Sequence, residues 1–84
     1  SFPGERFGFG GFPAYRQLGD MLYKDGFYDN ARNSFLMATR MNPNSDDSYL
    51  GLGKAEMKLN NNSDAKVALK KAGKISTSLL ALTD

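Results

Sequence analysis

Two consecutive segments of this chain, residues 12–45 and 46–79, share one spacing of small and large apolar residues. In the first segment the positions are Tyr15, Leu18, Gly19, Leu22, Ala31, Phe35, Ala38 and Pro43. Thirty-four residues later the second segment repeats six of them, as Tyr49, Leu52, Gly53, Ala65, Leu69 and Ala72. Apolar residues at three- and four-residue intervals predict helices, two in each segment. A period of this length is typical of helix–turn–helix repeats that stack side by side.

Turn and capping residues indicate where these helices begin and end. Gly26 suits a left-handed stop after the first helix, and Ser45 is a good N-cap for the third. Ser63 is the expected cap of the last helix, which is predicted to run from about Asp64 to Leu82. Gly19 has a packing role, because a residue without a side chain lets the second helix of the pair approach closely.

With these residues the chain resembles the tetratricopeptide repeat family over both segments. The first is the closer match, with Leu22 where the family usually has tyrosine. The second departs from the pattern at Glu56 and Asn60, which replace the equivalents of Leu22 and Gly26, and at Thr77, which replaces the closing proline. The resemblance implies an all-α superhelical solenoid of two repeats that binds other proteins. The alternative is a generic pair of helical hairpins whose spacing matches by accident.

The two ends of the chain need a separate explanation. Residues 1–12 contain four glycines and four phenylalanines, which suit no regular element, so we predict an extended arm. Its anchors, on the domain's own groove or on a partner, would be Phe2, Phe7, Phe9 and Phe12. Residues 13–79 would hold the repeats, and residues 80–84 would continue the last helix. The last helix has an apolar face formed by Ile75, Leu79, Leu80 and Leu82. We expect this face to be buried against another chain. The alternatives are that the tail folds back onto its own repeat or that it frays.

A ligand site is implied by the resemblance, because the first helix of each tetratricopeptide pair lines a concave groove. The groove residues would be Arg16, Asp20, Tyr23, Lys24, Asp47, Leu50, Lys54, Met57 and Lys58. This mixture of cations with aromatic and aliphatic residues suits a peptide segment, although a solvated helix face would look the same. The carboxylate clamp of some family members is not expected, because Asp20 replaces an asparagine and a third repeat is missing.

A second candidate surface is a positive stripe on the last helix. Its residues are Lys66, Lys70, Lys71 and Lys74. The stripe could meet an acidic protein or an anionic membrane surface, while a solvated charged face is the commoner explanation.

Composition argues against catalysis and cofactors. The chain has no cysteine and no histidine, which removes thiolate chemistry and the commonest general base. Its net charge of +2 is small for a nucleic-acid binder. No apolar run approaches the roughly 20 residues that span a bilayer. We therefore expect no enzyme activity, no metal and no cofactor.

The predicted function is non-catalytic protein–protein interaction, as a small accessory or scaffold subunit docked in a larger assembly. The alternative is a free-standing adaptor that binds a peptide of its partner in the groove. The chain begins at Ser1, as a processed product or an excerpt of a longer protein would. The cytoplasm, or an organelle interior after removal of a targeting peptide, fits this sequence.

Overall fold

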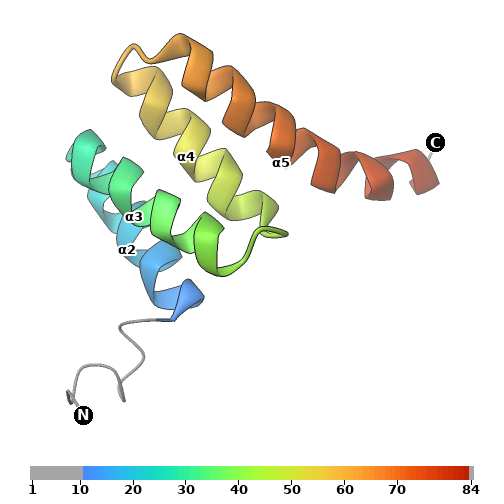
Figure 1. The fold of residues 1–84 in the computed structure, drawn as a ribbon, viewed down its shortest axis with the longest axis horizontal. Coiled ribbons are helices and arrows are strands. Elements are labelled where there is room, and N and C mark those ends of the chain that lie inside the picture. The colour runs from blue at the N-terminus through green and yellow to red at the C-terminus, as the bar shows by residue number, and fades with distance from the viewer. Residues whose placement is uncertain (1–10, 84) are drawn as a thin grey trace.

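The computed structural model describes the backbone of residues 11–83 and the side chains of residues 14–73, and this part of the chain is all-helical. The helices follow in the order α2 (Phe12–Lys24), α3 (Tyr28–Met41), α4 (Asp46–Lys58) and α5 (Asn62–Thr83). Figure 1 shows two antiparallel pairs, α2 with α3 and α4 with α5, and α4 packs against the first pair. The predicted all-α class is confirmed.

The turns inside the two pairs have the same backbone structure. Gly26 has a φ of 88° and Asn60 a φ of 65°, so both are left-handed. In each turn the next residue donates its N–H to the carbonyl five positions earlier, at 2.8 Å in the first and 2.9 Å in the second. This is the Schellman arrangement of a helix C-terminus. Gly26 takes its predicted role, and Asn60 can take the same role because asparagine tolerates this conformation.

The starts of α4 and α5 differ from each other. Ser45 caps α4 as predicted, because its hydroxyl accepts the Ser48 N–H at 3.2 Å. The prediction for α5 was wrong by two residues: the helix begins at Asn62, so Ser63 lies inside its first turn. The reason is that Asn61, which closes the turn after α4, also provides the carbonyl for the first hydrogen bond of α5.

The core is centred on Phe35 of α3, which is 1% exposed. Its ring lies between two glycines on neighbouring helices. A Cβ added to Gly19 of α2 would lie 2.8 Å from the ring, and a Cβ added to Gly51 of α4 would also overlap with it. Ala31 and Ala38, on the same helix, are fully buried beside the ring. The close approach predicted at Gly19 is therefore confirmed, and Gly51 adds a second one.

One residue expected in the apolar stripe of the first helix is instead exposed. Leu18 of α2 is 43% exposed, whereas its equivalent Leu52 of α4 is buried. The difference arises because α4 lies between α3 and α5, while the outer side of α2 has no described helix against it. Met41 is also exposed, since it is the last residue of α3 and lies beyond the helix crossings.

The same substitution at two helical glycines should have opposite effects on stability. Gly51→Ala places a methyl group against the Phe35 ring, and such overpacking costs about 1–3 kcal/mol. Gly73→Ala meets no atom within 4 Å of the new Cβ, so the better helix propensity of alanine should stabilise the fold by roughly 0.5–1 kcal/mol. Denaturant unfolding of both variants measures the two shifts. Shifts of the same sign would show that Gly51 is not needed for the helix crossing.

Candidate interaction surfaces

The first candidate surface, the α2–α4 hollow, has a volume of about 270 Å³. Its lining residues are Arg16, Asp20, Asp47, Leu50, Gly51 and Lys54. Five of the nine predicted groove residues therefore lie together, drawn from the first helix of each pair. Lys24 and Met57 are exposed but do not line this hollow.

Charges in the α2–α4 hollow are partly matched within the protein. Arg16 donates to an Asp20 carboxylate oxygen at 2.5 Å, one helical turn away. Asp20 is exposed, and pairs of this kind contribute little to stability because water screens them. Lys54 Nζ lies 5.1 Å from the centre of the Tyr23 ring. A ligand carboxylate entering the hollow would therefore meet Lys54 as a cation that has no carboxylate partner among the described ion pairs.

Two lysines of α4 cover tyrosines of the first helix pair. Lys54 lies over Tyr23, and Lys58, one turn further on, lies 5.7 Å from the centre of the Tyr28 ring. The two rings meet edge to face, with centroids 5.3 Å apart. A lysine over a tyrosine ring contributes about 0.5–1 kcal/mol at an exposed site. The predicted groove residues Tyr23 and Lys58 thus help to hold α4 against α2 and α3.

Glu56 is a buried acid, 6% exposed, at the position equivalent to Leu22. Asn61 donates its Nδ2 to Glu56 Oε1 at 2.8 Å. The Arg32 guanidinium is 4.0 Å from the same oxygen and also pairs with Asp29 at 3.2 Å. The second turn therefore replaces an apolar contact with a hydrogen-bonded pair, and the buried carboxylate is compensated.

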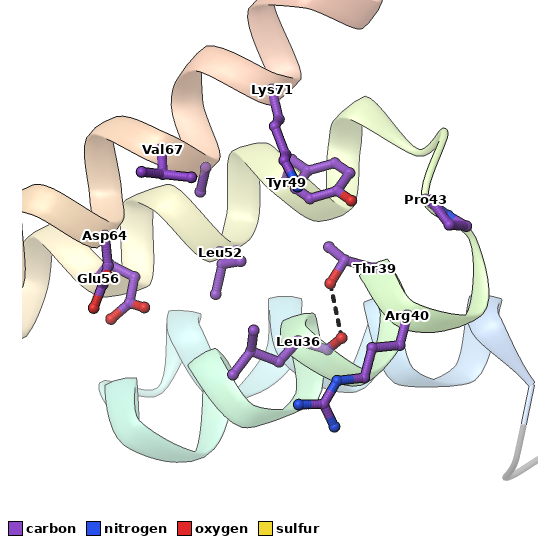
Figure 2. A pocket seen from close by; sticks show the side chains of 11 residues that line it. Leu36, Thr39, Arg40, Pro43, Tyr49, Leu52, Glu56, Asp64, Val67 and Lys71 are labelled. Atoms are coloured by element: carbon purple, nitrogen blue, oxygen red, sulfur yellow. Dashed lines mark hydrogen bonds between the residues drawn. The ribbon is translucent and has the colours of Figure 1, made fainter.

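A larger space, the α3–α5 groove, lies over α4 and was not predicted from the sequence (Figure 2). Its volume is about 550 Å³. It exists because α3 and α5 do not contact each other within the part of the chain that the structure describes. Tyr49 and Leu52 lie on the α4 floor, with Leu36 on the α3 side and Val67 on the α5 side. Val67 is 58% exposed, so the groove presents an apolar side chain to solvent.

The ends of the α3–α5 groove carry opposite charges. Glu56 and Asp64 lie together at one end, and Arg40 and Lys71 lie toward the other (Figure 2). Lys71 Nζ is 5.4 Å from the centre of the Tyr49 ring, so this member of the predicted lysine stripe turns toward the groove. An extended or helical segment with a basic and an acidic end would match this polarity.

The sequence contained a signal for the α3–α5 groove. Leu36 and Val67 are large apolar residues on the second helices of the pairs, outside the repeated small-and-large pattern. The predicted groove includes only first helices, because the family resemblance places the ligand there.

A third surface, the α2 outer face, forms an apolar hollow of about 260 Å³. Its lining residues are Ala14, Tyr15, Gln17, Leu18 and Met21. Thirty-four residues later the equivalent residues of α4 are all buried: Ser48, Tyr49, Gly51, Leu52 and Ala55. The residues of the α2 outer face are thus the equivalents of those through which α4 packs.

The fourth surface, the α5-end face, lies at the opposite end of the helix array. A hollow of about 250 Å³ is lined by Asp46, Asp47, Leu50, Leu69, Ala72 and Gly73. Leu69 is only half-buried there, although it is the equivalent of the fully buried Phe35.

Several of the remaining predicted site residues either lie outside the described part of the chain or have only their backbone described. Phe2, Phe7 and Phe9 lie outside the described residues. Helical backbone is described, without side chains, at Phe12, Lys74, Ile75, Leu79, Leu80 and Leu82. Lys66 and Lys70 are exposed on α5, as a positive stripe requires.

Over the described residues, no group of three or more acidic side chains is arranged to hold a metal ion. None of the helices described here is both long enough and apolar enough to cross a bilayer.

Comparison with known proteins gives no family assignment. No protein-family model, curated protein or solved structure matches this chain.

Proposed function

We propose that this chain is a pair of tetratricopeptide-like repeats and acts as a non-catalytic protein-interaction module, a small accessory subunit docked in a larger assembly. Backbone bonds that recur thirty-four residues apart support the repeat. Tyr15 donates its N–H to the Gly11 carbonyl at 3.2 Å, and Tyr49 donates to the Ser45 carbonyl at 3.3 Å. The two left-handed turn residues have the same separation.

The observation that carries the proposal is that the next helix covers Phe35, whereas no described helix covers its equivalent, Leu69. In the first pair Phe35 packs on Gly19, and in the second Leu69 packs on Gly53, where an added Cβ would lie 2.6 Å from the leucine. The next helix then covers Phe35 with Gly51. No described helix covers Leu69 in that way. A partner could therefore pack on the α5-end face as α4 packs on the first pair.

The first pair also suggests what the partner brings. A glycine allows α4 to approach the Phe35 ring, and larger residues would collide with it. A partner helix on the α5-end face would present a small residue to Leu69 for the same reason. Its flanks would carry cations, because Asp46 and Asp47 lie at the edge of this face.

The second candidate function is the free-standing adaptor. The clustering of five predicted groove residues in the α2–α4 hollow favours it. In that case a ligand peptide would lie between α2 and α4, and its carboxylates would meet Lys54. The Arg16–Asp20 pair and the Lys54–Tyr23 contact would have to rearrange on binding, because both occupy the hollow or its edge.

Two sets of variants separate these functions in the full chain, tagged and captured from its source cell. Gly73→Glu places a charged side chain over the α5-end face at a position where a new Cβ meets no atom. The groove set changes Arg16, Tyr23 and Lys54 to alanine. Gly73→Ala is the matched control, since it fills the same position without a charge. Size-exclusion chromatography of the captured material measures assembly.

We expect Gly73→Glu to release the chain from its assembly, while Gly73→Ala and the groove set stay bound. Circular dichroism of each purified variant verifies that helix content is kept. Assembly that survives Gly73→Glu but is lost in the groove set would replace the accessory subunit with the adaptor.

A further inference from the structure

The α2 outer face has the chemistry of a covered surface. Its hollow is lined almost entirely by carbon, and Leu18 and Met21 are 43% and 63% exposed in it. The equivalent side of α4 is buried by the preceding helix pair. Large apolar residues at successive turns of one helix face are expected where another segment packs.

A preceding helix pair of the same design would not fit this face. The close approach of α4 to Phe35 depends on Gly51, and α2 has Gln17 at that position. Where α4 has the fully buried Ala55, α2 has the much longer Met21. These two side chains would hold a helix away, so a thinner segment, with extended backbone, is the better occupant.

We propose that the glycine- and phenylalanine-rich arm of the same chain is this occupant, with Phe7 and Phe9 packed against Leu18 and Met21. The tether is short. Gly11, the N-cap of α2, has extended backbone with φ −82° and ψ 154°, and the hollow starts within the first turn of the helix. Residues 1–10 would turn back and run along α2.

The spacing of the two rings matches the helix. Alternate residues of an extended segment point to the same side and lie about 6.7 Å apart. Successive turns of a helix are 5.4 Å apart, so Phe7 and Phe9 can contact two consecutive turns of the α2 outer face. Gly10 follows them, and the lack of a side chain there lets the chain reverse direction before α2.

This docking is within one chain and does not depend on the partner proposed above. A tethered segment binds as if its local concentration were in the millimolar range, so weak aromatic contacts suffice to hold it. The arm would then be part of the folded module, and the α5-end face would be left as the surface for the assembly.

The test uses methyl-labelled methionine in the full chain, which has four methionines. Ring currents from a stacked phenylalanine move a neighbouring methyl signal upfield. Phe7→Leu and Phe9→Leu keep apolar side chains and remove the rings, so we expect the Met21 methyl signal to move downfield in both. The matched control is Met57, which is also exposed but lies far along α4; its signal should stay in place. Tyr15 contributes equally in all variants.

Three results would overturn the proposal. The first is a Met21 signal that is unchanged in both variants. The second is a shift at Met57 in place of Met21, which would put the arm near the C-terminal end of α4. The third is a Met21 shift that disappears on dilution, because the arm would then come from another copy.

Trypsin cleavage after Arg6 gives an independent measurement that does not involve the phenylalanine variants. A docked arm is protected, so Leu18→Ser should speed this cleavage several-fold by weakening the α2 outer face. Met57→Ser, the same kind of change on another exposed apolar residue, should leave the rate unchanged. Equal cleavage rates in wild type and Leu18→Ser would contradict docking at this face.

Discussion

Phe35→Ala is expected to remove a large part of the free energy of unfolding of this chain. The Phe35 ring is the largest fully buried side chain and lies between Gly19 and Gly51. The glycines that line the ring on both sides have no side chains, so they cannot fill the cavity left by the substitution. Such a substitution costs about 3–5 kcal/mol, which is comparable with the lower part of the 5–15 kcal/mol range of natural domains. Far-UV circular dichroism and denaturant unfolding measure the loss.

Leu36→Ala is the matched control for this prediction. It removes a large apolar side chain from the adjacent residue of α3, but Leu36 is only half-buried and lines the α3–α5 groove. Its loss should therefore lower the free energy of unfolding by clearly less than Phe35→Ala. Equal losses would mean that α2, α3 and α4 do not meet at the Phe35 ring, and the packing scheme would have to be abandoned.

Local rules explain why much of this fold could be predicted from the sequence. The left-handed turn at Gly26 and the cap at Ser45 each depend on a few neighbouring residues, and both are found where the sequence put them. The approach at Gly19 follows from the repeated small-and-large spacing. The prediction that Ser63 caps the last helix was wrong because Asn61 both closes the turn after α4 and begins α5. No single capping rule describes that combination.

The surfaces were harder to predict, because they depend on distances between helices. The family resemblance implied that Arg16, Asp47 and Lys54 share a groove, and they line one hollow, but it could not show that Tyr23 lies beneath Lys54. The α3–α5 groove depends on how far two helices diverge over a third, and a periodic pattern does not encode that angle. One departure from the repeated pattern, however, could have indicated a polar contact. An acid at Glu56, where leucine stands in the first repeat, needs a polar partner nearby.

The second large effect concerns the C-terminal apolar set. The backbone of α5 runs on to Thr83 and passes the end of α4 (Figure 1). The sequence of this extension predicts an apolar face, with Ile75, Leu79, Leu80 and Leu82. If a partner covers these residues in the assembly, the isolated chain must expose them or associate with itself. Stability of an associating chain depends on its concentration by mass action.

The variant Leu79→Ser with Leu80→Ser should therefore abolish complex formation and make the isolated chain more soluble, while the helices of the first pair are kept. In wild type the thermal midpoint should rise with protein concentration, and in the double variant it should not. Thr77→Ser with Ser78→Ala changes two polar residues in the same turns and serves as the control. A wild-type monomer with a concentration-independent midpoint and a strongly protected Leu79 amide would contradict the prediction. The extension would then pack on its own repeats, and the α5-end face would need no partner, because the chain itself would cover it.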